Sequence, residues 1–175
     1  HVRMHNNKNN IAVIGYLTWA NDMKVNEFMK TDPIFHYRRL KDKGYCSFGN
    51  FFTCNLSIKK HWFRNDLFDE KFSPSMIGKE DIELGYRLVK NGLKIAFNKD
   101  AVAYHYHYLD EKEFMKRTER MGELDVLFHN KYPELGNKLR LLITTKLMLF
   151  FLSPLKLYNI FLLNLNRKLY WRLNL

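Results

Sequence analysis

The stretch that decides the fold is FDEKFSPSMIGKEDIELGYRLVKNGLKIAFNKDAVAYHYH, residues 68–107. Ile82, Tyr86 and Val89 recur at the spacing of one helix face, and the Asn-Gly pair at 91–92 is a typical stop, so the pattern predicts a helix over 80–91. The apolar segments 93–97 and 101–108 after it are predicted to be two short strands.

Two acidic residues, Glu80 and Asp81, stand at the start of the predicted helix, just after a loop that contains Gly78. The backbone N–H groups and the dipole of a helix start favour negative charge, so a carboxylate there stays ionised. It is well placed to accept a proton from a bound hydroxyl group. Acidic residues in a first turn are also common simply as helix caps, and the pair alone does not separate these two roles.

Outward from this stretch, the β-branched and aromatic residues at 11–19 predict a buried strand. Residues 34–43 and 57–64 are predicted to be helices, and 45–54 a strand or a loop that enters a site. Residues 110–130 form a charged amphipathic pattern that predicts a longer helix, which ends near Pro133.

The character of the chain changes after residue 135. No Asp or Glu follows Glu134, although seven Lys or Arg do, and they lie beside an apolar run that Pro154 interrupts. We therefore expect a basic, apolar helical tail over 136–175, with helices at an anionic membrane surface. Packing of this segment on the core, or a true membrane span, are the alternatives.

Composition agrees with a globular chain with a polyanionic partner. The 175 residues carry a net charge of +11, and 46% of them are hydrophobic. Such charge fits a nucleic acid, a membrane surface or a diphosphate. The basic residues cluster with Leu and Phe rather than forming a stripe with interleaved aromatic residues, so we expect lipid and no nucleic acid. The two cysteines, Cys46 and Cys54, form no metal-binding spacing and suit a reducing cytoplasm.

Seventeen positions in chain order carry a resemblance to a known family. They are Gly49, Asn55, Ser57, Lys60, Phe63, Phe68, Asp69, Glu70, Gly78, Glu80, Asp81, Glu83, Leu84, Arg87, Leu88, Gly92 and His105. This set resembles the C-terminal half of a family-2 glycosyltransferase with the GT-A fold, and the resemblance covers about residues 11–130. It implies an α/β fold, with a catalytic part at 1–135 and the tail at 136–175.

The resemblance also implies roles for single residues. Asp81 would be the general base of an inverting transfer, which takes the proton from the acceptor hydroxyl, and Glu80 would orient the acceptor or the loop. The loop near the donor sugar and acceptor would be formed by several small and polar residues. These are Gly49, Asn50, Asn55, Asp69 and Gly78.

A divalent metal, Mn²⁺ or Mg²⁺, is the cofactor that the resemblance implies. The family carries a metal-coordinating histidine on a strand after the helix. His105, 24 residues after Asp81, is the candidate, and His107 is the alternative because it lies on the same face of the strand. Tyr104, Tyr106 and Tyr108 would point the other way. A pair of structural histidines is the competing interpretation.

One element of the family is missing from this sequence. No two of the nine aspartates are spaced as Asp-x-Asp, the pair that would hold the metal with the nucleotide diphosphate. We therefore expect the chain to start near the midpoint of the catalytic domain, without the nucleotide-binding half. The strand at 11–19 would then have an unpaired edge, because its parallel neighbours would be absent.

The sequence thus predicts a glycosyltransferase fragment, inactive alone, for surface polysaccharide or glycan synthesis. Its partners would be a nucleotide-diphosphate sugar and a saccharide or lipid-linked saccharide acceptor, and its location cytoplasmic and peripheral to the membrane. The alternative is a non-catalytic remnant that binds a membrane or a partner enzyme.

Overall fold

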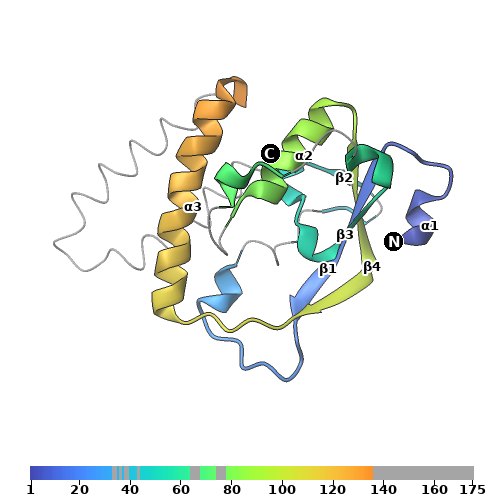
Figure 1. The fold of residues 1–175 in the computed structure, drawn as a ribbon. Helices are drawn as coiled ribbons and strands as arrows, with labels where there is room; N and C mark the ends of the chain where they lie inside the picture. The colour runs from blue at the N-terminus through green and yellow to red at the C-terminus, as the bar shows by residue number, and fades with distance from the viewer. Residues whose placement is uncertain are drawn as a thin grey trace.

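The computed structural model describes residues 1–32, 35, 37, 40–42, 44–63, 68–73 and 78–135. Within them the chain forms a mixed α/β fold, with a four-stranded sheet in the order β2-β4-β1-β3. The strands are β1 (Ile11–Trp19), β2 (Tyr45–Cys46), β3 (Leu56–Ile58) and β4 (Lys94–His105). The helices are α1 (Val2–His5), α2 (Glu80–Lys90) and α3 (Glu111–Lys131). Helices α2 and α3 lie on one side of the sheet and α1 on the other (Figure 1).

Strand β1 is central, which corrects the expectation of an unpaired edge. It pairs in parallel with β4 along its whole length and antiparallel with β3 through Ala12, Val13 and Ile14. The expectation was wrong because it considered only parallel neighbours from a preceding half. Residues 57 and 58, which were predicted to begin a helix, belong to β3, which pairs with the first part of that edge.

Strand β4 is one long strand where two short ones were predicted. Its register to β1 shifts between Gly15, which faces Asn98, and Tyr16, which faces Val102. The three residues between Asn98 and Val102 form a bulge, so the polar break in the sequence pattern does not end the strand. After the bulge the strand continues to His105, the candidate metal ligand.

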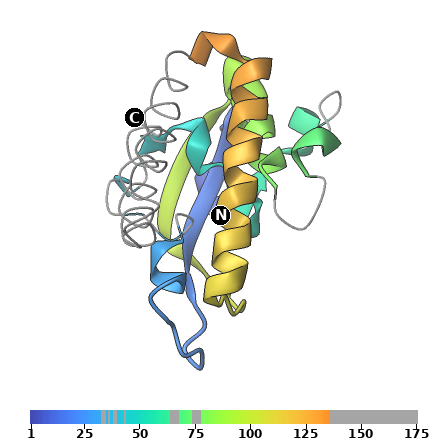
Figure 2. The ribbon, with the colours of Figure 1, turned by 90° about the vertical axis from the view of Figure 1, so that its left-hand side faces the viewer.

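The two longer helices match their predicted ranges closely. Helix α2 ends at Lys90, and the Asn91 N–H then donates to carbonyl groups of the last turn, as the predicted stop requires. Helix α3 begins after Asp110, whose side chain caps it by accepting from the Glu113 N–H. Figure 2 shows α3 running alongside the strands, at the front of the sheet.

The core lies between the sheet and the two helices. Leu84 and Leu88 of α2 are fully buried against Phe51 and the apolar residues of β1 and β4. Phe128 of α3 packs with Phe72 in a second cluster that joins α3 to α2. The start of α2 is therefore fixed between the sheet on one side and α3 on the other.

Some predicted elements differ or lie elsewhere. The predicted helix at 57–64 is a strand end followed by the 3-10 turn η5 (Lys60–Phe63), and 45–54 contains strand β2 and the 3-10 turn η3 (Phe48–Asn50). Half of the predicted helix at 34–43 falls outside the described residues, and the tail at 136–175 falls entirely outside them. Among the residues that are described, no helix is long and apolar enough to cross a membrane.

Candidate active site

The start of α2 is set by a tight approach of three chain segments. The Lys79 N–H donates to the Phe72 carbonyl at 2.8 Å, which brings the 3-10 turn η6 (Glu70–Phe72) against the helix start. A Cβ on Gly78 would lie 1.9 Å from Oε2 of Glu80 and 2.8 Å from the Phe72 oxygen. Gly78, predicted as a loop residue of the site, is therefore required because no side chain fits between Glu80 and the turn.

Asp81 lies in the first turn of α2, and backbone donors hold both of its carboxylate oxygens. Its Oδ1 accepts from the Ile82 N–H at 2.7 Å, and its Oδ2 accepts from the Thr53 N–H at 3.3 Å. Burial raises the pKa of Asp81 from 3.8 to about 6, the two N–H donors oppose that rise, and the neighbouring Glu80 carboxylate adds to it. A carboxylate with a pKa near 6 is ionised at neutral pH yet more basic than an ordinary aspartate, which suits a general base.

We predict that Asp81 lowers the stability of the fold as pH rises. Well below pH 4 the Asp81 carboxyl is protonated in both the folded and the unfolded chain. As pH rises toward 6 the unfolded chain ionises first, because the folded pKa is raised to about 6, so the folded state loses free energy. Relative to Asp81→Asn, the wild type should lose about 1 to 2 kcal/mol of unfolding free energy between about pH 4 and pH 7.5.

Urea unfolding of both proteins at the two pH values measures this difference. Asp22→Asn, at an exposed position, is the control for loss of an aspartate charge. An Asp81→Asn stability difference that is the same at both pH values would show that Asp81 titrates as an ordinary exposed residue.

Glu80 lies behind the base, against the loop. Its Oε2 is shielded from solvent and has no hydrogen-bond partner among the described residues. The same oxygen packs against Gly78, so the carboxylate lies on the loop. Of the two predicted roles for Glu80, this position favours orientation of the loop over contact with the acceptor.

The segment that faces Asp81 contains the predicted loop residues Gly49 and Asn50. Gly49 is buried in η3, and the Asn50 side chain donates to the hydroxyl of Ser47 at 3.2 Å. Phe51, fully buried against α2, anchors the segment. The loop thus approaches Asp81 through the backbone of Thr53, and the side chain of Asn50 folds back on its own turn.

Cys54, which the sequence analysis left without a role, lies next to the base. Burial raises the pKa of its thiol to about 11, and the negative charges of Asp81 and Asp32 add to the rise. Asp32 is itself almost fully buried, with Nη2 of Arg117 at 3.7 Å from its Oδ2. No motif in the sequence connects residues 32, 54 and 81, so only the tertiary structure relates them.

Asn55 holds the sheet together and is not a free loop residue. Its Nδ2 donates to the carbonyl of Tyr16 at 3.0 Å and to that of Ala101 at 2.8 Å, across the bulge between β1 and β4. Its Oδ1 lies 2.8 Å from Nε2 of His1. The amide is therefore engaged within the fold, which gives Asn55 a structural role beside the contact with the donor sugar or the acceptor that was predicted for it.

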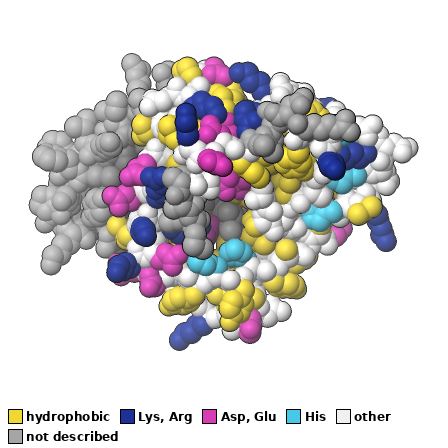
Figure 3. All heavy atoms as spheres, in the orientation of Figure 1, with side chains coloured by type: hydrophobic (Ala, Val, Ile, Leu, Met, Phe, Trp, Pro, Cys, Tyr) yellow, Lys and Arg dark blue, Asp and Glu magenta, His cyan; other side chains and the backbone are white. Residues whose placement is uncertain are grey.

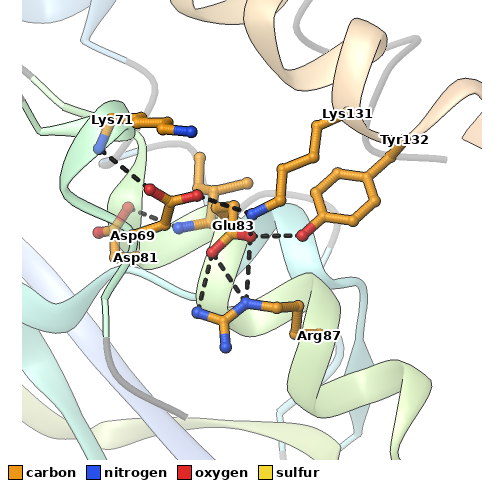
Figure 4. A network of polar contacts seen from close by, with 8 residues as sticks. Asp69, Lys71, Asp81, Glu83, Arg87, Lys131 and Tyr132 are labelled. Atoms are coloured by element: carbon orange, nitrogen blue, oxygen red, sulfur yellow. Dashed lines mark hydrogen bonds and ion pairs between the residues drawn. The ribbon is translucent and has the colours of Figure 1, made fainter.

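Asp69 and Glu83 belong to one polar network between α2, η6 and the end of α3 (Figure 4). Glu83 is fully buried, and Lys131 donates to its Oε1 at 2.6 Å. Tyr132 also donates to Oε1, and the Arg87 guanidinium binds both oxygens at 3.0 to 3.1 Å. Lys131 also reaches Asp69 at 2.8 Å and holds the pKa of that carboxyl low. Asp69 thus fixes the turn before the site and does not face it.

Lys131 and Tyr132 were not predicted to have a role near the site. They lie 48 and 49 residues after Glu83, at the end of a helix whose charged residues are typical of a solvent-exposed face. The only clue was Glu83, the third acidic residue at the start of the predicted helix. A buried carboxylate requires donors, but the sequence does not say which ones.

His105 is the last residue of β4, whereas the predicted strand ran to residue 108, so His107 lies beyond the strand. The ring of His105 lies among aromatic residues. The ring centroids of Trp19 and Phe35 are 5.5 and 5.9 Å away, and burial lowers the pKa of His105. Nε2 of His107 lies 3.2 Å from Oε1 of Glu113. Histidine side chains lie side by side near the middle of the face in Figure 3, with acidic side chains close by.

These surroundings do not fit a divalent metal. Within the described residues no group of three or more His, Cys, Asp or Glu side chains is arranged to hold an ion. Mn²⁺ and Mg²⁺ prefer several oxygen ligands, whereas the His105 ring has the rings of Trp19 and Phe35 beside it, and the nearby Asp32 is paired with Arg117. The tyrosines at 104, 106 and 108 are more than half exposed.

Comparison with known proteins adds no relative. No family model matches this chain, and neither a curated protein nor a solved structure matches it significantly.

Proposed function

We propose that this chain is the acceptor-side part of an inverting glycosyltransferase with the GT-A fold, of family 2, in which Asp81 is the general base. The observation that carries the proposal is the environment of Asp81. It combines a helix start, two backbone donors and a pKa raised to about 6. The ordered motif around it, which runs from Gly49 to His105, supports the same assignment.

The chemistry assigned to this chain is a single proton transfer. The acceptor hydroxyl gives its proton to a carboxylate oxygen of Asp81 while its oxygen attacks the anomeric carbon of the donor. The bond from that carbon to the nucleoside diphosphate breaks, and the configuration inverts. The Thr53 and Ile82 N–H groups fix the plane of the carboxylate, so the base needs no reorganisation as the proton arrives.

The diphosphate leaving group requires charge neutralisation, and the part of the chain that the structure describes holds no group of ligands for a metal that would supply it. The sequence has no Asp-x-Asp pair, and His105 lies among aromatic rings. We therefore assign no metal-dependent step to these residues and expect the isolated 175-residue chain to be inactive. The acceptor class that we propose is a saccharide or a lipid-linked saccharide.

The test uses the product of the complete gene, with a panel of labelled nucleotide-diphosphate sugars and a membrane extract as the source of acceptor. Transfer of label to a saccharide or lipid-linked product supports the proposal. Failure of every donor in the panel, by a folded protein and in the presence of Mn²⁺ or Mg²⁺, counts against it.

A second candidate function is a non-catalytic module that binds a membrane or a partner enzyme. It is favoured by the composition after Glu134, where basic residues accompany an apolar run and acidic residues are absent. On the face in Figure 3, by contrast, acidic and basic side chains of the described residues are interspersed. That mixture does not favour a nucleic-acid surface there.

We predict that residues 136–175 attach the chain peripherally to an anionic membrane on the cytoplasmic side. The full chain should sediment with vesicles of phosphatidylglycerol, and removal of 136–175 should abolish this, because the segment supplies both apolar surface and seven positive charges. About 0.5 M salt should weaken the binding without releasing all of the protein. Vesicles of phosphatidylcholine are the control, and complete release by salt would contradict the apolar contribution.

A further inference from the structure

Helix α3 contacts α2 on both sides of the base. Nζ of Lys79, two residues before Asp81, forms an ion pair with Asp125 of α3. Glu83, two residues after Asp81, accepts from Lys131 and Tyr132 at the end of α3. The contacts occur in the same order along both helices, so α3 fixes the first turn of α2 at two points.

A second route leads from the end of α3 to the same turn. Lys131 binds Asp69, and Asp69 caps η6 by accepting from the Lys71 N–H at 3.1 Å. Turn η6 in turn presents the carbonyl of Phe72, which accepts from the Lys79 N–H at 2.8 Å. The ammonium group of Lys131 therefore restrains α2 directly, through Glu83, and indirectly, through the turn η6 that precedes the helix.

The burial of this network indicates that it fixes geometry. The Glu83 side chain is fully buried, whereas those of Arg87 and Lys131 remain 22% and 37% exposed. A buried ion pair adds little net stability over apolar packing, because removing its charges from water is costly. It does penalise any arrangement that separates the partners, since that leaves a charge buried alone. Such a contact holds one position of α2 and excludes others.

We propose that α3 is a positioning element for the base, in which Lys131 and Tyr132 act through Glu83, and Asp125 through Lys79, to hold Asp81 against the backbone of Thr53. The proposal rests on the proposed function only where it names Asp81 the base. The position of the Asp81 carboxylate can be measured without any transfer reaction. Cys54 directly follows Thr53, whose N–H binds Asp81, so the charge of Asp81 is expected to affect the reactivity of the Cys54 thiol.

The experiment measures the rate at which iodoacetamide alkylates Cys54 in the full chain at about pH 8. Peptide mapping separates the exposed Cys54 from Cys46, which is half-buried and whose thiol pKa burial raises to about 12. Asp81→Asn removes a negative charge near Cys54, so more thiolate forms and the rate should rise about threefold to tenfold. Lys131→Met should also raise the alkylation rate of Cys54, by at least half as much as Asp81→Asn on a logarithmic scale. Without the Lys131 contacts the Asp81 carboxylate is expected to move away from the Cys54 thiol.

Two variants separate positioning from general loosening. In the Asp81→Asn background, Lys131→Met should change the rate by less than about twofold, because no Asp81 charge remains to move. Lys131→Arg, which keeps the charge, should restore most of the wild-type rate. Arg120→Met is the matched control, because it also removes a positive charge from α3. The ion pair of Arg120 is with Glu123 of the same helix and does not reach α2. It should leave the rate unchanged.

The proposal is overturned if Lys131→Met leaves the Cys54 rate unchanged, or raises it equally with and without Asp81. If Lys131→Met does not fold, Tyr132→Phe decides the question. It removes one hydroxyl that donates to Glu83 and should raise the rate about twofold, only in the presence of Asp81. Failure of the transfer assay would leave this result intact, so the two proposals fail separately.

Discussion

Replacing Asp81 with asparagine is expected to lower the kcat of sugar transfer by about 100-fold or more, and to leave donor binding nearly unchanged. Asparagine has the shape of aspartate and can still accept from the Thr53 or the Ile82 N–H, but it cannot take the acceptor's proton. The loss should therefore appear in kcat, because the missing interaction belongs to the transition state.

The measurement is an initial-rate assay of the complete gene product at saturating donor. In the wild type the rate should rise with pH through about 6, where Asp81 loses its proton, and Asp81→Asn should remove that dependence. Asp22→Asn, at an exposed position, should keep the wild-type rate. Turnover of Asp81→Asn within a few-fold of the wild type would show that another group is the base.

Replacing Gly15 with alanine is expected to destabilise the fold by roughly 3 kcal/mol, more than a hundredfold in the folding equilibrium. A Cβ at this position would lie 2.1 Å from the Ala101 carbonyl oxygen and 2.4 Å from Nδ2 of Asn55. Both atoms are fixed, because the Asn55 amide bridges β1 and β4 across the bulge. Relief of the clash therefore requires that the two central strands separate.

Gly122→Ala is the matched control, since a Cβ at Gly122, within α3, meets nothing within 4 Å. Alanine in a helix interior is better than glycine by about 0.5 to 1 kcal/mol, so this variant should be slightly more stable than the wild type. Urea unfolding of the three proteins gives the comparison. Similar stability of Gly15→Ala and the wild type would contradict the bulge geometry.

The sequence predicted the elements whose local pattern and tertiary environment agree. Strand β1 is a continuous apolar run, α2 has a helical stripe with a stop, and α3 has a capping aspartate. Residues 57 and 58 were predicted wrongly, because Ser57 read as a helix cap while pairing with β1 decided the outcome. The sequence motif predicted that Asn55 and Asp69 belong to the loop of the site. In the structure, both side chains form hydrogen bonds that hold elements of the fold together.

The sequence by itself determined that a carboxylate, Asp81, stands in the first turn of a helix, since helix period, loop and acidic pair are all local features. Only the tertiary structure decided that the pKa of this carboxylate is raised. Its pKa depends on burial and on the N–H of Thr53, 28 residues away in the chain. The partners of Glu83 were decided in the same way, because a buried charge requires donors and packing of α3 on α2 selects them.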